Sequence, residues 1–266
     1  MTSMKLTAEE QKQLAERLYA AAKAGQGVDP PSETINYTFD DAYRVRRILV
    51  DKLIADGGVP KGHKIGFTAK AMQEMYGMSG PDFGQLMDNM FVPYGEPVAI
   101  GHLSDTRVEP ELAFEMAGPM EGPGITLADV LKNTARIWTS IELIDSRVGA
   151  TRADAVDSIA DNACAGKVVL GPQSFSVDEY DFGNIDVSLT VDGETLTGNS
   201  SEVMGHPGEP VAWLANRLAE INGLGGRIEA GDIVMSGSCT RSMIVKPGSK
   251  LHADFGPLGE IAIDFV

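Results

Sequence analysis

The chain has 266 residues, 43% of them hydrophobic, which is enough for one large core or a core with a small helical lobe. Its formal net charge of −16 argues against nucleic acid or an anionic membrane as a partner. Two cysteines cannot build a disulfide framework in a chain of this length, and we find neither a signal peptide nor a stretch apolar enough to span a membrane. We therefore expect a soluble, cytoplasmic protein.

Residues 1–60 predict a helical N-terminal layer. A capping box at 7–10 opens a helix whose apolar residues repeat at helical spacing until Gly25. A second amphipathic helix begins near Thr38 and ends at Gly57. The two helices should pack their apolar faces on the rest of the protein.

Residues 61–266 predict a β-rich body, because short apolar segments alternate there with Gly and Pro. Strands are expected at 63–67, 109–116, 138–144, 168–170, 185–191, 233–237 and 261–266. The dipeptide Asp192-Gly193 predicts a hairpin turn, and further helices are expected from Thr126 and over 211–221. The predicted fold class is α+β, with layer and body forming one functional unit.

Two glutamates on one expected strand are the first candidate metal ligands. Residues two apart on a strand face the same side, so Glu109 and Glu111 would aim their carboxylates at a common point. A divalent cation relieves the repulsion between such carboxylates, although two ordinary glutamates on a solvated strand face are the alternative. Pro110 between them lacks an N–H, which predicts a position at a sheet edge or a strand start.

Glu142 strengthens the metal hypothesis. It lies inside an apolar run at 140–144, where a carboxylate needs a partner. The alternative is a salt bridge, with Arg136 or Arg147 as the nearest cations in sequence. Ligation by carboxylate oxygens alone favours Mg²⁺ or Mn²⁺, and the four histidines show no spacing typical of a metal site.

Other segments offer candidate catalytic and substrate-binding groups. Lys64 lies between two glycines on an expected strand, where it could supply positive charge or transfer a proton, unless it is a surface lysine. Asp82 follows Pro81 in what its sequence predicts to be a turn. Cys164 is expected to be a small buried residue rather than a nucleophile.

Candidate substrate-binding residues come from two small polar segments. Asn162 is the first, in a segment of small residues where the chain could close on a ligand. Ser238, Thr240 and Arg241 follow the expected strand at 233–237. Arg241 could hold a carboxylate through two hydrogen bonds, although a solvated arginine is the commoner case.

Taken in order, these segments resemble the hydratase/decarboxylase branch of the fumarylacetoacetate hydrolase superfamily. The resemblance runs from the second helix to the C-terminus and depends on an ordered set of short motifs: GHKIGFT at 62–68, PDFG at 81–84, RVEPELAF at 107–114, IELIDSR at 141–147, ADNA at 160–163, GHP at 205–207, VAWLAN at 211–216 and GDIVMSGS at 231–238. It implies a mixed β-roll or β-barrel-like body with metal on Glu109, Glu111 and Glu142. It also implies active-site roles for Lys64 and Asp82 and a homo-oligomer. Pro110 departs from the aliphatic residue usual in that motif.

The same resemblance implies a metal-dependent hydratase of aromatic-compound catabolism. Its expected substrate is a small 2-oxo acid or diacid, in the first place 2-oxohept-3-ene-1,7-dioate, and its product is a 4-hydroxy-2-oxo acid. Arg241 would then bind the distal carboxylate, since the pair Thr240-Arg241 resembles the diacid subgroup. The alternatives are a 2-hydroxypentadienoate hydratase, a 4-oxalocrotonate-type decarboxylase, an acylpyruvate hydrolase and a non-enzymatic metal-binding scaffold.

Overall fold

The computed structural model describes residues 4–100, 106–149, 154–221 and 226–266. Its helices are α1 (Ala8–Ala24), α2 (Phe39–Ala55), α3 (Lys70–Met75), α4 (Leu127–Lys132), α5 (Ala155–Ala160) and α6 (Gly208–Glu220). Its strands are β1 (Pro60–Gly66), β2 (Asp82–Met87), β3 (Thr106–Met116), β4 (Thr134–Asp145), β5 (Ala165–Phe175), β6 (Asp186–Val191), β7 (Glu194–Asn199), β8 (Ile233–Ser238), β9 (Met243–Ile244), β10 (Lys250–Asp254) and β11 (Glu260–Asp264). None of the helices in these ranges is long and apolar enough to cross a membrane.

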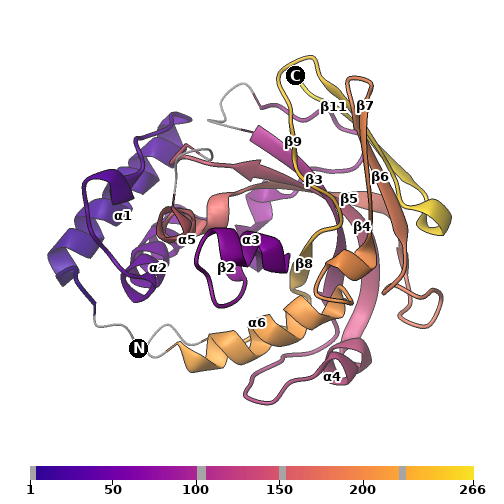
Figure 1. The fold of residues 1–266 in the computed structure, drawn as a ribbon, viewed down its shortest axis with the longest axis horizontal. Helices are drawn as coiled ribbons and strands as arrows, with labels where there is room; N and C mark the ends of the chain where they lie inside the picture. Colours follow the sequence, from indigo (N-terminus) through magenta and orange to yellow (C-terminus); the bar gives the residue numbers. More distant parts are fainter. Residues whose placement is uncertain (1–3, 101–105, 150–153, 222–225) are drawn as a thin grey trace.

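The predicted helices of the N-terminal layer are present. The Thr7 hydroxyl caps α1 in the predicted capping box, and Gly25 ends the helix in the left-handed conformation. Thr38 and Asp41 form a second capping box at the start of α2. Figure 1 shows α1 lying beside α2, and α2 in turn packs against α5 of the body. The division at residue 60 stays a prediction.

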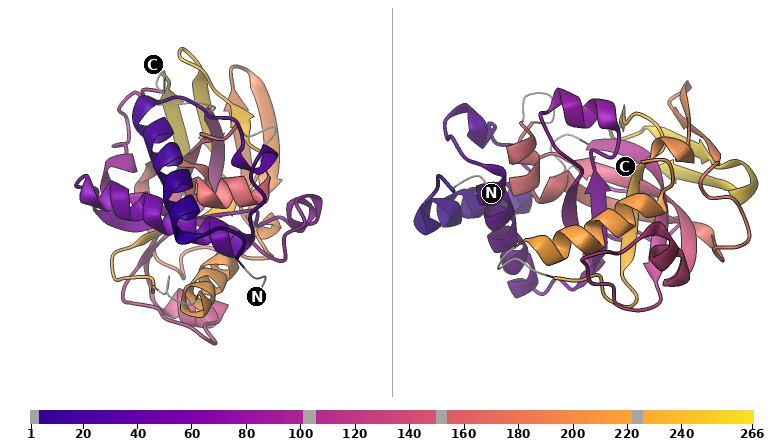
Figure 2. Two further views of the ribbon diagram at one scale, coloured as in Figure 1. Left: turned by 90° about the vertical axis from the view of Figure 1, so that its left-hand side faces the viewer. Right: turned by 60° about the horizontal axis from the view of Figure 1, so that its bottom comes forward.

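Within the described residues, seven strands form the main sheet, in the order β2-β1-β8-β3-β4-β5 with β9 beside β3. Every strand predicted from the sequence is present, with ends shifted by a few residues. A second sheet has the order β11-β10-β6-β7 in the described chain, and the predicted turn at Asp192-Gly193 joins β6 to β7. Figures 1 and 2 show this second sheet at the end of the molecule opposite α1 and α2. The predicted α+β fold class is confirmed.

Strand β3 lies inside the main sheet and is buried on both faces. Val108, Leu112 and Phe114 face the main hydrophobic core, and all three are fully buried. Side chains alternate between the two faces of a strand, so Glu109 and Glu111 lie together on the opposite face of β3. The metal candidates therefore lie on a strand that the rest of the fold holds rigidly.

The prediction that Pro110 lies at a sheet edge or strand start is wrong, because β3 pairs with β4 on one side and with β8 and β9 on the other. Pro110 falls between the two stretches of β3 that pair with β9 and with β8, next to an irregularity in the register. Its carbonyl accepts a hydrogen bond from the Cys239 N–H on that side. The missing N–H faces the same side, where the partner changes, so the interior strand tolerates proline.

The sequence wrongly predicts a turn at 81–84, since Asp82 begins strand β2. The turn was predicted from the segment Pro81-Asp82-Phe83-Gly84, but the glycine in it is required by a long-range contact: a Cβ at 84 would lie 2.2 Å from the Asn162 carbonyl oxygen. Helix α5 also escaped prediction. Its buried Asp157 accepts hydrogen bonds from the Tyr37 hydroxyl and the Ser32 N–H of the N-terminal layer, partners that local sequence does not reveal.

Candidate functional site

Three glutamates converge on the face of β3 and β4 that points away from the main core. Glu109 and Glu142 lie directly opposite each other in the antiparallel register, and Glu111 is opposite Ser140. One carboxylate oxygen from each glutamate lies within 4.8 Å of the other two. Glu111 and Glu142 are buried and Glu109 is half-buried, so water screens the repulsion between their charges only weakly.

The hydrogen bonding of these glutamates fits a divalent cation. The Gly237 N–H donates to Glu111 Oε2 at 2.8 Å, but Glu111 Oε1 and Glu142 Oε2 accept no hydrogen bond from the described residues. Burial, and next repulsion from Glu142, raises the pKa of Glu109 to about 7 and that of Glu111 well above its ordinary value. A cation would satisfy the unpaired oxygens and relieve the repulsion, and a set of carboxylate oxygens suits Mg²⁺ or Mn²⁺.

Lys64 is the cation nearest to Glu142. It extends from β1, is 4% exposed, and its Nζ lies 3.4 Å from Glu142 Oε1. Burial alone would lower the pKa of Lys64, but the Glu142 and Asp82 carboxylates outweigh that effect and raise it. The alternative of a salt bridge from Glu142 to Arg136 or Arg147 is wrong, because Arg147 pairs with Asp145 and Asp161 and Arg136 reaches Ser176.

Asp82 lies on the other side of Lys64, at the start of β2. Its register partner on β1 is Gly66, and a Cβ there would lie 2.4 Å from Asp82 Oδ1 and 3.3 Å from Lys64 Nζ. Glycine at 66 thus lets the aspartate and the lysine approach each other. The Ser158 hydroxyl of α5 donates to Asp82 Oδ2 at 3.2 Å, and burial raises the pKa of Asp82 despite the nearby Lys64 charge.

A cavity of about 1170 Å³ opens over these groups. We call the buried or half-buried polar groups at its base the floor, namely Lys64, Asp82, Glu109, Glu111 and Glu142. Lys64, Asp82 and Glu109 line the cavity directly. We call four polar residues between the end of β8 and the segment after β9 the rim, namely Ser238, Thr240, Arg241 and Lys246, all of which line the cavity. Met72 and Tyr76, on and after α3, line another part of its wall.

The first part of the rim is a turn held by its own hydrogen bonds. Ser238 Oγ donates to the Thr240 carbonyl at 2.7 Å and accepts from the Thr240 N–H at 3.3 Å. This turn leads the chain to Arg241, whose side chain is exposed at the mouth of the cavity. Arg241 thus adds a positive charge to the border of the cavity that opens over the floor.

The sequence comparison decides the family. A sequence model of the family described as fumarylacetoacetate (FAA) hydrolase C-terminal matches residues 67–266, which include the rim and every floor residue except Lys64. The chain belongs to this family.

Other members of the FAA hydrolase family match nearly the whole chain. The 2-oxo-hept-4-ene-1,7-dioate hydratase of Escherichia coli is 38% identical over 261 residues, which cover 95% of this chain and 97% of that protein. The 4-oxalocrotonate decarboxylase of Pseudomonas sp. strain CF600 is 33% identical, covering 90% of each. The structure of 4-oxalocrotonate decarboxylase from Pseudomonas putida G7, complexed with magnesium and adipate, has a TM-score of 0.94 at 30% identity and covers 99% of this chain and 100% of that one. The resemblance to the hydratase/decarboxylase branch is thereby confirmed.

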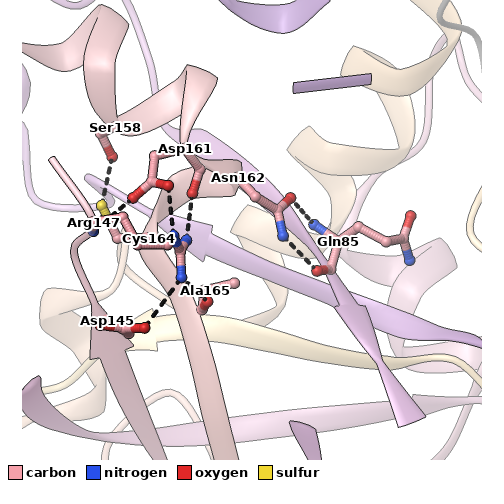
Figure 3. Close-up of polar contacts among 8 residues, drawn as sticks. All are labelled: Gln85, Asp145, Arg147, Ser158, Asp161, Asn162, Cys164 and Ala165. Carbon is pink, nitrogen blue, oxygen red and sulfur yellow. Dashed lines mark hydrogen bonds and ion pairs between the residues drawn. The ribbon is translucent and has the colours of Figure 1, made fainter. Parts of the chain in front are cut away.

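This FAA hydrolase family member brings eight of the nine predicted site residues together on the floor and rim. Asn162 is the ninth: its side chain binds the backbone of β2 and it is not among the residues that line the cavity, although its neighbours Ala163 and Cys164 are. Figure 3 shows its side chain turned toward Gln85, where Oδ1 accepts from the backbone N–H at 2.8 Å and Nδ2 donates to the backbone carbonyl at 2.9 Å. Its predicted contact with substrate finds no support in this geometry.

Sequence reasoning missed Ser158 and the two glycines that shape the floor. Ser158 gave no local signal, because its contact with Asp82 joins residues 76 positions apart. The sequence showed Gly66 beside Lys64, and glycine inside a strand often marks close approach, but it did not reveal that the approaching group is Asp82. Gly237 has a φ of 104°, and a side chain there would collide with Thr68. In this glycine-specific conformation its N–H donates to Glu111. Cys164 is buried, as expected, and burial raises the pKa of its thiol to about 12.

Proposed function

We propose that this chain is a divalent-metal-dependent hydratase that adds water to an unsaturated 2-oxo acid, in the first place 2-oxohept-3-ene-1,7-dioate, in the catabolism of aromatic compounds. The observation that carries the proposal is the floor: three converging glutamates with unpaired oxygens, flanked by Lys64 and Asp82 at the base of one cavity. A scaffold protein has no need of such a set, because burying like charges destabilises the fold unless they are used.

Glu109, Glu111 and Glu142 would hold the cation, with Mg²⁺ favoured by their oxygen donors. When bound, it supplies a Lewis acid that polarises the 2-oxo group of a substrate. Gly237 keeps Glu111 oriented through its N–H, so the ligand set is fixed before substrate arrives.

Lys64 and Asp82 would move protons and place water. The Lys64 ammonium, kept charged by the surrounding carboxylates, offsets negative charge that develops on the dienolate. Asp82, held by Ser158, would carry a proton between oxygen and carbon as a 2-hydroxydienoate becomes the conjugated 2-oxo-3-enoate. Water then adds across that double bond, with hydroxyl bonding to C4 and a proton to C3, which gives the 4-hydroxy-2-oxo acid.

The rim would select the distal end of the substrate. Arg241 would bind a second carboxylate, which is supported by its position on the cavity lining after the Ser238–Thr240 turn. The relatives support a diacid, since the E. coli protein is named for a seven-carbon diacid and the decarboxylase structure holds adipate. Assembly into a homo-oligomer stays a prediction.

A decarboxylase is the second candidate, supported by the TM-score of 0.94 to 4-oxalocrotonate decarboxylase. It would use the same floor, but the distal carboxylate would leave as CO₂ instead of water adding at C4. The 2-hydroxypentadienoate hydratase alternative would instead leave the rim without a carboxylate to bind.

Product analysis separates these reactions. The protein would be mixed with 2-hydroxyhepta-2,4-dienedioate, with Mg²⁺ or with EDTA, and the product identified by mass. We expect a gain of one water that requires Mg²⁺. The six-carbon diacid 4-oxalocrotonate would be tested in the same way, because only there does loss of the distal carboxylate leave an electron pair conjugated with the 2-oxo group. Loss of CO₂ from that substrate, without hydration of the seven-carbon diacid, would identify the decarboxylase. Conversion of only the five-carbon monoacid would identify the pentadienoate hydratase. No metal-dependent reaction with any of them would overturn the proposed function.

A further inference from the structure

The strand that carries Asp82 has one side unpaired by any described strand, and two side chains close it. β2 is the last strand of the main sheet in the described chain and pairs with β1 alone. On its other side the Phe83 carbonyl accepts from Arg46 Nη1 at 2.8 Å. Two residues further on, the Gln85 N–H and carbonyl both bind the Asn162 side-chain amide. Asn162 therefore pairs with β2 as one residue of a neighbouring strand would.

Asn162 can do this because it lies in an unusual turn. Residues 162, 163 and 164 have φ values of 55°, 51° and 54°, a left-handed run without a glycine. L-residues adopt this conformation at a cost, which the surrounding structure must offset. Asparagine tolerates it better than most residues, and that suits the position whose side chain does the pairing.

Arg147 holds both ends of this turn. Its Nη2 donates to the Asp161 carbonyl at 2.7 Å and its Nη1 to the Ala165 carbonyl at 3.1 Å, just before and just after the left-handed residues. Its Nε and backbone N–H also bind the Asp161 carboxylate, and Asp145 is the second ion-pair partner (Figure 3). All of these side chains are buried, so the clamp is rigid.

The turn is pressed directly against β2 next to Asp82. Gly84 has no positive φ, so the backbone conformation does not demand glycine there. Glycine is required at 84 by the Asn162 carbonyl oxygen, because any Cβ at this position would collide with it. A shift of the turn would therefore move the strand two residues from Asp82.

We propose that Asn162 is a positioning residue for Asp82, which it serves by pairing with the open side of β2 from a left-handed turn clamped by Arg147. The catalytic meaning of this role rests on the proposed function, because it assumes that Asp82 transfers protons. Both polar atoms of the Asn162 side chain bind the Gln85 backbone, which favours a positioning role over a contact with substrate.

The test compares three variants. N162G removes the side chain and keeps a residue that adopts a positive φ freely, whereas N162D keeps the acceptor for the Gln85 N–H and loses the donor. N216A is the matched control, because Asn216 makes the same pair of bonds to the Ile125 backbone, at 2.9 and 2.8 Å, from helix α6.

We expect N162G to lower kcat roughly 10- to 100-fold with KM changed less than about twofold, and N162D to keep part of that kcat. Hydrogen exchange of the segment 82–87 should speed up roughly tenfold or more in N162G, while the affinity for Mg²⁺ stays that of the wild type. N216A should keep the wild-type kcat, KM and exchange of 82–87.

Three results would overturn the proposal. A higher KM with unchanged kcat would make Asn162 a substrate contact, and unchanged exchange of 82–87 would remove its support of β2. An equal loss of kcat in N216A would reduce the effect to general stability. If the wild type turned over none of the dienoates, the proposed function would fail, and the exchange experiment would still decide whether Asn162 holds the strand.

Discussion

The floor of the cavity is built on strands and nearly closed to solvent, whereas the rim is built on a turn and open to it. Lys64 and Glu142 are 4% and 1% exposed, and each floor side chain is placed by strand register or by a named hydrogen bond. Arg241 is exposed and follows a turn held by two hydrogen bonds. The difference indicates that the reaction depends on the floor, while the choice of substrate can change at the rim without disturbing the sheet.

Glu111→Gln tests the floor most severely. Gln still accepts from the Gly237 N–H, but the cation loses a charged ligand. Turnover should fall roughly 10³-fold, since Lewis-acid stabilisation is worth several kcal/mol. The wild type should gain about 2.7 kcal/mol of stability at 100 times the Kd for Mg²⁺ and the variant almost none, measured by denaturation with Mg²⁺ and with EDTA.

Glu115→Gln is the control on the same strand, because Glu115 binds Trp138 Nε1 and lies outside the metal group. If Glu111→Gln kept the stabilisation by Mg²⁺, the cation would bind elsewhere.

Asp82→Asn separates proton transfer from metal binding within the floor. We expect kcat to fall about 10²-fold or more, because the amide cannot carry the proton, while the affinity for Mg²⁺ measured by calorimetry stays the same. Asp88→Asn, in the short turn that follows β2, should leave both quantities unchanged. A loss of Mg²⁺ affinity in Asp82→Asn would show that Asp82 contributes to metal binding together with the glutamates.

Arg241→Ala tests the rim. The ratio of kcat/KM for the seven-carbon diacid to that for the five-carbon monoacid should fall roughly tenfold, since a charge-assisted hydrogen bond is worth about 1.5 kcal/mol at an exposed site. Lys246→Ala, on the same rim, serves as the comparison for a general effect of positive charge. Equal losses for both substrates in Arg241→Ala would sink the assignment of the distal carboxylate to this residue.

His63 gives a smaller effect, on stability rather than on turnover. Burial, and then the Arg46 charge, lowers its pKa to about 3, although Asp232 Oδ2 lies 4.0 Å away. The unfolded chain therefore binds a proton at His63 near pH 6.5, whereas the folded protein binds it only near pH 3. The contribution of the neutral His63 to the free energy of unfolding is thus complete above pH 6.5 and is lost as the pH falls toward 3.

At pH 5 the loss from His63 should be about 2 kcal/mol relative to pH 7. Urea denaturation at both pH values should show a smaller loss in His63→Gln, while His252→Gln, which removes an exposed imidazole, should behave as the wild type. The same pH dependence in His63→Gln as in the wild type would assign the effect to other groups.

The metal group could be predicted from the sequence because strand period alone brings Glu109 and Glu111 to one face, and Glu142 stood out as a charge in an apolar run. The floor around Asp82 could not. The segment Pro81-Asp82-Phe83-Gly84 predicted a turn in place of strand β2, although Gly84 is glycine because the Asn162 carbonyl leaves no room for a Cβ. Asn162 itself was expected to contact the substrate, whereas its side chain binds Gln85. The turn prediction failed because the contact that requires glycine at 84 joins residues nearly 80 positions apart, and a local pattern carries no information about it. The same holds for the bonds of Asn162 to Gln85, and its contact with substrate stays a prediction.

Arg46 has a consequence for how the protein could be divided or recombined. Its guanidinium lies 3.8 Å from the centre of the Phe83 ring and binds the Phe83 carbonyl, so the second helix of the N-terminal layer reaches the residue beside Asp82. A truncated chain beginning at β1 would lose that cation and leave both ring and carbonyl without their partner. The helical layer is therefore not an interchangeable module, and a graft from another protein would have to bring its own cation to this spot.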